Sequence, residues 1–376
     1  MNPRERFRET LLFGNPDKVS FSPGGPREST LKAWHSQGLP EDVNWFGHLL
    51  EILGVEREES KCERVGLGVS FEMIPQFEEK VIERKADSQI VQDWKGNICE
   101  ISNEFDVSYL RDAKDFCTRR WIKCPIESRG DWERMKERYD PHDPDRAPAD
   151  FVERCRKLRD RDYVSTIHFS APFWQLREWC GFEGLCMLLI DDPGFVHEMI
   201  EFWTGFVLET MRPILENVEL DCVGMSEDMA YKAHSMISPA MVREFLMPAY
   251  ERWVPAIKAS GCPLIDMDSD GFIGELIPIW IDVGINVCDP IEVAAHNDIV
   301  EFRRTFGRKM AYRGGIDKRA MAAGGDLLRD EMQRVIPPLL EDGGFIPSCD
   351  HGVPADVSWP NFIDYARQLA ELTGWL

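Results

Sequence analysis

The sequence lacks the features that mark several large classes of protein. No stretch approaches the run of about 18 apolar residues that crosses a membrane. The first residues, MNPRERFRETLLFGNPD, are charged and amphipathic and contain no apolar core of a secretory signal. We therefore expect a cytoplasmic protein with no membrane partner.

Basic residues and paired cysteines are also scarce. The chain has 44 Lys and Arg against 66 Asp and Glu, a formal net charge of -22. Binding to nucleic acid or to anionic lipid needs clustered Lys and Arg, so neither partner is expected. None of the 11 cysteines forms a C-x-x-C pair. The cysteines therefore indicate neither a zinc ribbon nor a disulfide framework.

What remains is the composition of an ordinary globular protein, 43% hydrophobic and 29% charged over 376 residues. From about residue 160 onward, short apolar segments alternate with helix-length amphipathic segments. This alternation predicts right-handed crossovers and a parallel sheet. No G-x-G-x-x-G opens a helix, which argues against a doubly wound nucleotide-binding sheet. We predict an α/β fold, a (β/α)8 TIM barrel with N-terminal elaborations, as one domain over 1–376.

The first 160 residues precede the regular units of 161–376 and predict a more varied structure. KVSFSPGG, residues 18–25, is typical of a first strand and turn, and residues 40–53 of a helix. Residues 89–102 predict a hairpin that turns at Gly96-Asn97. The proline-rich segment 141–148 lies between two helical segments, so we expect a surface excursion or a lid there.

The segment LIDMDSDG, residues 264–271, matches the first half of a calcium-binding loop, but its twelfth position is Ile277 and not a carboxylate. The apolar run before it indicates a strand end instead. On a strand Asp266, Asp268 and Asp270 share one face. Because three carboxylates in a dry interior would repel one another, we expect Asp266 low in the barrel with a partner, and the other two at the rim.

Other polar residues follow the predicted strands, at the end where barrel enzymes carry their chemistry. His351, in SCDHGVP, is expected to exchange protons at the mouth. The long polar segment MSEDMAYKAHSMISP is expected to touch ligand. Arg313 in YRGGID is placed either to bind an anionic group or to pair with Asp317. Most aromatics of APFWQLREWCGF are expected in the core, with Trp174 as the exception.

Five motifs in this order resemble the uroporphyrinogen decarboxylase superfamily: EDMAYK, MISPAMVREFLMPAY, DMDSDG, GGIDKRAMA and SCDHGVPADVSW. The resemblance covers residues 160–376 well and the N-terminal part loosely. One arm of the superfamily decarboxylates uroporphyrinogen without a cofactor. The other contains zinc methyltransferases that move methyl groups between a corrinoid protein and a thiol or another acceptor.

Each arm carries a motif that can be compared with this chain. The decarboxylase arm holds its substrate with an arginine-rich signature like R-Q-A-G-R, whereas SPGGPREST offers only Arg27. Decarboxylation of uroporphyrinogen is therefore not expected. The methyltransferase arm binds zinc through H-x-C and a final cysteine. Here Asp268, Asp270 and Cys349 take those positions, so the resemblance implies zinc on these three residues or no metal.

The resemblance implies an enzyme that transfers a methyl group involving a corrinoid protein or a methylated small molecule, and a homodimer. In this hypothesis one set of residues is catalytic: His351, Asp268, Glu227 and Tyr231. A second set binds substrate: Asp228, Lys232, Arg313, Asp289 and Trp174. Two alternatives stay open: cofactor-free decarboxylation of a small carboxylic acid, and a barrel that only binds a tetrapyrrole or corrinoid.

Overall fold

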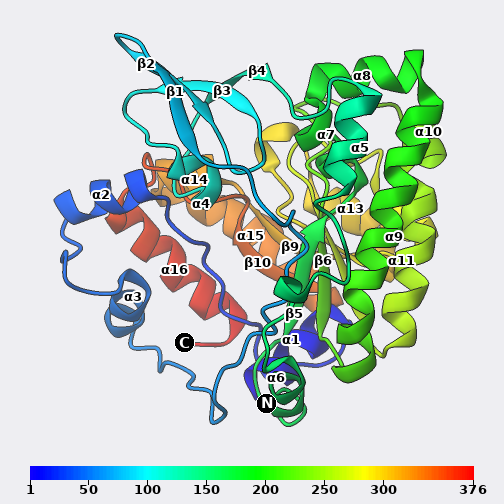
Figure 1. Ribbon diagram of the computed structural model, residues 1–376. Helices are drawn as coiled ribbons and strands as arrows, with labels where there is room; N and C mark the ends of the chain where they lie inside the picture. The colour runs from blue at the N-terminus through cyan, green and yellow to red at the C-terminus, as the bar shows by residue number, and fades with distance from the viewer.

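The computed structural model describes all residues from 1 to 376 and contains two sheets. The larger is parallel, with its six strands in the order β10-β9-β8-β7-β6-β5. Each strand therefore pairs with its neighbour in the chain, as expected of a TIM barrel (Figure 1). The strands are β5 (Thr166–Ser170), β6 (Cys222–Ser226), β7 (Leu264–Asp268), β8 (Val287–Asp289), β9 (Ala311–Ile316) and β10 (Phe345–Cys349).

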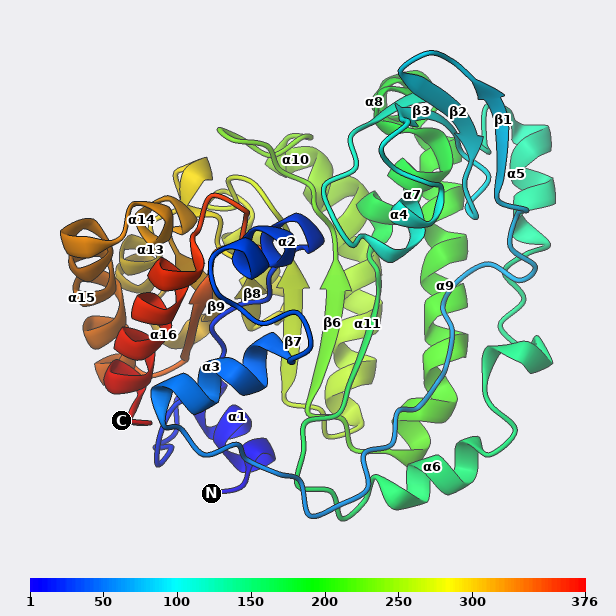
Figure 2. The ribbon, with the colours of Figure 1, turned by 90° about the vertical axis from the view of Figure 1, so that its left-hand side faces the viewer.

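Helices follow the strands and cover the outside of this sheet (Figures 1 and 2). Several begin at a capping side chain followed by proline, as at Asp192 and Ser238, which makes their start predictable. The helices and helical turns are α7 (Pro172–Cys180), α8 (Phe182–Asp191), α9 (Pro193–Asn217), α10 (Pro239–Met241), the π-helical turn η2 (Val242–Leu246), α11 (Met247–Ala259), α12 (Ile277–Val283), η3 (Val293–Ala295), α13 (Ile299–Phe306), η4 (Gly307–Lys309), α14 (Lys318–Ala323), α15 (Gly325–Asp342) and α16 (Trp359–Thr373). None of the helices is long and apolar enough to span a bilayer.

The N-terminal part forms a four-stranded antiparallel sheet and several short helices. The predicted hairpin is present as β2 and β3, with Gly96 in the turn at φ 90°. In Figure 2, β6 and β7 point toward the end of the molecule where this sheet lies. The elements are α1 (Pro3–Leu11), α2 (Glu28–Ser36), α3 (Trp45–Leu53), β1 (Lys80–Arg84), β2 (Ser88–Gln92), β3 (Ile98–Ser102), α4 (Ser108–Asp112), β4 (Arg119–Lys123), α5 (Arg129–Lys136), η1 (Pro144–Arg146) and α6 (Phe151–Lys157).

The expected first strand at 18–25 does not form. This segment forms no strand, and the one ladder contact near it is a bridge between Pro26, just after the segment, and Val353, just after β10. Two prolines, Pro23 and Pro26, remove backbone donors that a full ladder would need. The prediction of a regular strand was therefore wrong, although the chain does line this edge of the sheet.

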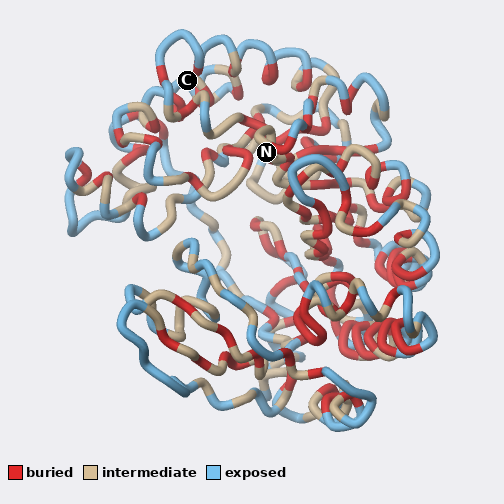
Figure 3. The backbone as a smooth tube through the Cα atoms, turned by 90° about the horizontal axis from the view of Figure 1, so that it is seen from above, coloured by how far each residue is buried: buried red, intermediate tan, exposed pale blue.

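Alternate residues of each strand face opposite sides of the sheet, and the two sides differ in kind (Figure 3 shows the burial). The side chains that face the helices belong to one large apolar core, such as Met267 of β7 and Phe345 of β10. The side chains that face inward form a small apolar floor, closed by Leu11 of α1. Above that floor the inward positions of the strands carry polar groups.

Candidate active site

Carboxylates from neighbouring strands meet inside the barrel above the apolar floor. Asp268 of β7 is paired in register with Asp289 of β8, and Asp266 lies two positions earlier on the inward face of β7. These three side chains, with Arg313 of β9, line a cavity of about 570 Å³. The expected clustering of polar residues from several strand ends is therefore present.

Arg313 is the one cation in the lining of this cavity. It donates a hydrogen bond to Asp266 and its Nη1 lies 3.4 Å from Asp289 Oδ2. Burial lowers the pKa of Arg313, but Asp266 and Asp289 outweigh burial, so its net pKa is raised. Asp266 thus has the partner that the sequence predicted, while Arg313 does not contact Asp317, which pairs with Arg319 instead.

Asp268 belongs to a hydrogen-bonded chain that crosses three strands. His168 Nε2 lies 2.6 Å from Ser226 Oγ, and this hydroxyl donates to Asp268 Oδ2 at 2.8 Å. Burial raises the pKa of Asp268 to about 6, although Ser226 partly offsets the rise. Burial lowers the pKa of His168. Asp268 is therefore a carboxyl that can exchange a proton close to neutral pH.

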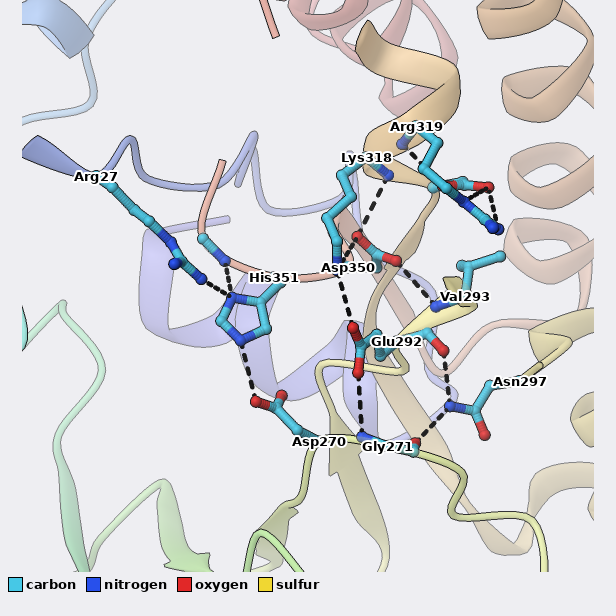
Figure 4. A network of polar contacts seen from close by, with 12 residues as sticks. Arg27, Asp270, Gly271, Glu292, Val293, Asn297, Lys318, Arg319, Asp350 and His351 are labelled. Carbon is cyan, nitrogen blue, oxygen red and sulfur yellow. Dashed lines mark hydrogen bonds and ion pairs between the residues drawn. The ribbon is translucent and has the colours of Figure 1, made fainter. Parts of the chain in front are cut away.

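His351 lies at the rim, immediately after β10, and contacts Asp270 (Figure 4). Its Nε2 lies 3.0 Å from Asp270 Oδ2, while its Nδ1 lies 3.1 Å from Arg27 Nη2. The hydrogen bond to Asp270 raises the pKa of His351, and burial and Arg27 offset part of that rise. The structure therefore brings two predicted residues together with Arg27, the one arginine in the segment where the decarboxylase signature would stand.

The rim beside His351 is fixed by a second set of polar contacts (Figure 4). Asp350 is fully buried and accepts hydrogen bonds from the amides of Val293 and Lys318, at 2.9 and 3.3 Å. Lys318 Nζ lies 3.1 Å from Glu292 and 3.7 Å from Asp350. Burial raises the pKa of Asp350 to about 6. These contacts hold the loops after β8, β9 and β10 together.

The loop after β6 was expected to touch ligand, and its residues are divided between core and solvent. Glu227 is fully buried, binds the hydroxyl of Tyr250 and accepts from the amide of Trp174 at 3.0 Å. Burial raises the pKa of Glu227 to about 7. The structure thus does not place Glu227 at the cavity. Its position, at the N-terminus of α7, is that of an anchor for that helix.

The other three predicted residues of this loop also lie outside the cavity lining. Asp228 pairs with Arg177 at 2.8 Å, and burial raises its pKa. Its φ of 37° is unusual for a residue other than glycine and marks a constrained strand end. Tyr231 is 52% exposed, and Lys232 is exposed and makes no ion pair.

Two aromatic residues of α7 lie in the core as predicted, whereas Trp174, which was predicted to bind substrate, does not line the cavity. Phe173 and Trp179 are buried in the core, whereas Trp174 is half-buried. The guanidinium of Arg177 lies 4.4 Å from the centre of the Trp174 ring, and Lys95 of the β2–β3 turn lies 6.0 Å from it. Trp174 therefore connects the N-terminal sheet to the barrel rim through cations and does not line the cavity.

Cys349 does not join Asp268 and Asp270. It shares the face of Phe345 on β10, which is the face turned toward the helices, and it lies in the large apolar core. Burial raises the pKa of its thiol to about 12. No group of three or more His, Cys, Asp or Glu side chains is arranged to hold a metal ion. As placed, these residues do not fit the zinc set that the resemblance implied.

Two members of the site, His168 and Ser226, were missed by reasoning from the sequence. A signal was present in β5, where Thr166, His168 and Ser170 alternate with apolar residues. Such alternation puts the polar set on one face of the strand, and in a barrel whose outer face packs against helices that face is the inward one. A histidine on the inward face indicates a functional site inside the barrel, because an interior that is only packed would carry apolar residues there.

Comparisons with known proteins agree with the barrel fold. The family model described as uroporphyrinogen decarboxylase (URO-D) matches residues 121–366. A uroporphyrinogen decarboxylase of Hydrogenovibrio crunogenus is 20% identical over 235 residues, 60% of this chain and 63% of the relative. The match thus spans less than two thirds of that relative's length.

Two solved structures are also similar. A methyltransferase from Methanosarcina mazei matches with a TM-score of 0.54 and 15% identity, and the match covers 99% of both chains. A B12-independent methionine synthase from Shewanella sp. W3-18-1 matches with a TM-score of 0.39 and 14% identity over 58% of this chain and 64% of that one. The family match and the full-length methyltransferase match confirm the predicted α/β TIM-barrel fold, of which the parallel sheet described above forms six strands.

Proposed function

Because the chain belongs to the uroporphyrinogen decarboxylase family, we propose that it is a barrel enzyme that transfers a methyl group from a methylated small molecule to an acceptor. The observation that carries the proposal is Asp268, a carboxyl with a pKa of about 6 that faces the interior cavity. A group of this kind can take a proton and return it near neutral pH.

The proposed transfer converts R–X–CH3 and A–H into R–X–H and A–CH3, where X and A are the heteroatoms of donor and acceptor. The A–H bond breaks, its proton goes to the Asp268 carboxylate, and the lone pair of A forms the bond to the methyl carbon. The C–X bond breaks with its electron pair on X. X then takes the proton back from Asp268, while Ser226 and His168 hold that carboxyl in place.

The pairing of the cations argues against a substrate with many carboxylates. Arg313 is held by Asp266 and Asp289, Arg177 by Asp228, and Lys318 by Glu292 and Asp350. A polycarboxylate would have to displace these carboxylates from their partners. The proposed methyl donor places no such demand on the site.

A second candidate function is decarboxylation of a small acid with one carboxylate, and one contact favours it. Arg27 contacts the ring of His351 but forms no ion pair with any carboxylate. Arg27 is therefore available to bind one anionic group at the rim. In that reaction carbon dioxide leaves, its bond pair stays on the substrate carbon, and the protonated form of His351, which contacts Arg27, supplies a proton to that carbon.

One experiment separates the two functions. The protein is incubated with a panel of 13C-methyl amines, ethers and thioethers, with a thiol as the acceptor A–H, and NMR follows the label. A parallel panel of small carboxylic acids is assayed for carbon dioxide. We expect label on the acceptor, little carbon dioxide, and loss of transfer in Asp268→Asn.

Asp282→Asn is the matched control, because Asp282 is an exposed carboxylate on α12 that pairs only with Arg243. Carbon dioxide release without methyl transfer would favour the second function. Equal transfer by Asp268→Asn and the wild type would remove the proposed role of Asp268.

A further inference from the structure

The lining of the cavity inside the barrel contains more acidic than basic side chains. Its lining contains three carboxylates, Asp266, Asp268 and Asp289, but only one permanent cation, Arg313. Burial and the nearby Asp266 raise the pKa of Asp289 well above its ordinary range. An additional cation between these carboxylates would relieve their repulsion.

One carboxylate of a residue that lines the cavity has a buried oxygen without a hydrogen-bond partner in the protein. Asp266 is bound to Arg313 through Oδ2, but its Oδ1 is buried and has no partner. The side chain is only 6% exposed, so bulk water does not satisfy this oxygen. An unpaired acceptor on a buried charged group is costly, and it points to a ligand that donates a hydrogen bond.

The rest of the lining is apolar enough to hold a hydrocarbon group. Phe7, Val164, Ile167 and Cys222 contribute to the walls. The volume of about 570 Å³ lies within the range of sites for small molecules. The cavity therefore combines apolar walls with carboxylates that lie on neighbouring inward positions of β7 and β8.

We infer that this cavity binds the protonated amine of a small aliphatic substrate, with the ammonium group against Asp266 Oδ1 and Asp289, beside Arg313, which keeps its contacts with Asp266 Oδ2 and Asp289. The ammonium N–H groups supply the donor that Asp266 Oδ1 lacks, and its charge opposes both carboxylates. No group of three side chains is arranged for a metal ion, which argues for an organic cation. The inference rests on the proposed function, because it names the substrate class of the same site.

Binding can be measured without turnover. Isothermal titration with propylammonium chloride at neutral pH is compared with potassium propionate, which is similar in size but anionic, and with potassium chloride at equal ionic strength. We expect saturable binding of propylammonium alone. Binding should also release protons, because the added cation favours ionised Asp289, and titrations in two buffers with different ionisation enthalpies measure this release.

Asp289→Asn should weaken propylammonium binding at least about tenfold and remove the proton release, a loss typical of a partly buried charged hydrogen bond. Asp266→Asn should weaken it as much, and Asp282→Asn should bind like the wild type. If Asp266→Asn fails to fold, Asp289→Asn decides alone, because the one side-chain contact of Asp289 is an ion pair at 3.4 Å with Arg313, which Asp266 still holds in that variant.

Three results would overturn the inference: no saturable binding to the wild type, equal binding of propionate, or wild-type affinity in the Asp289→Asn variant. Propylammonium carries no methyl group on nitrogen, so its binding is independent of methyl transfer. Binding without any methyl transfer would refute the proposed function and leave the amine site standing. Methyl transfer without amine binding would refute the amine site and leave the proposed function standing.

Discussion

The inward and outward faces of the same strands carry different chemistry. On β7, Asp266 and Asp268 face the cavity, whereas Ile265 and Met267 pack against the helices. On β10, the inward Ile346 belongs to the floor and the outward Cys349 to the core. The alternation of a strand thus decides whether a reactive residue can meet substrate. The motifs of Asp268 and Cys349 both lie at strand ends, but only Asp268 faces the cavity.

The largest expected effect is on turnover, when the reactive residue of each face is substituted in turn. Asp268→Asn should lower turnover by about 100-fold or more, because the amide cannot accept the proton. Cys349→Ser should keep wild-type turnover per folded molecule, since Cys349 faces the helices. Steady-state kinetics of the two variants on the same substrate makes the comparison. Equal losses would show that both faces reach the substrate.

The next largest effect is on stability, and here the outward face should matter more than the inward face. Phe345→Ala on the outward face of β10 should lower the free energy of unfolding by about 3–5 kcal/mol, because a fully buried ring leaves a cavity in the core. Ser348→Ala on the inward face should change it by less than about 0.5 kcal/mol. Urea unfolding followed by circular dichroism measures both. A large loss of unfolding free energy in Ser348→Ala would show that the inward face also contributes strongly to stability.

Asp268 should cost the protein stability at neutral pH. Its pKa is raised from 3.8 to about 6, so the folded state binds more protons than the unfolded state between these values. Stability therefore falls as the pH rises from about 4 to 6. Asp268→Asn removes this penalty and should be more stable than wild type at pH 7 by about 1 kcal/mol, with little gain at pH 4. Unfolding at both pH values tests the sign.

The smallest effect is expected at the rim. Because Asp270 raises the pKa of His351, their pair stabilises the folded state below the ordinary pKa of His351, and this contribution disappears as pH rises through the raised value. Asp270→Asn should therefore be less stable than wild type by a few tenths to about 1 kcal/mol at acidic pH. The difference should vanish at alkaline pH. A pH-independent difference would contradict the assignment.

Much of the fold was predictable because it depends on local patterns. The alternation of apolar and amphipathic segments predicted the barrel, and the Gly96 turn predicted the β2–β3 hairpin. The four-stranded sheet was not predicted, since β1 is exposed at every position and lacks the alternation of a half-buried strand. The first strand is missing because Pro23 and Pro26 lack the backbone N–H groups that a ladder needs. The apolar pattern of this segment predicted a strand because it takes no account of those missing donors.

The site was predictable only in part, for a different reason. Residues at strand ends could be recognised, and Asp266 was expected to have a partner. That the partner is Arg313, 47 residues away, depends on a register between strands that one sequence does not reveal. The direction of Cys349 could have been read from its spacing to Phe345. Its motif position, next to Asp350 and His351, suggested the mouth instead.

The central claim is that inward-facing Asp268 moves the proton during methyl transfer. The most direct test is the pH dependence of 13C-methyl transfer to a thiol acceptor, followed by NMR for the wild type and for Asp268→Asn. The wild-type rate should fall below a pH of about 6, where Asp268 becomes protonated. The variant should be slow at every pH and show no such fall. A variant that keeps the wild-type rate and pH profile would contradict the claim.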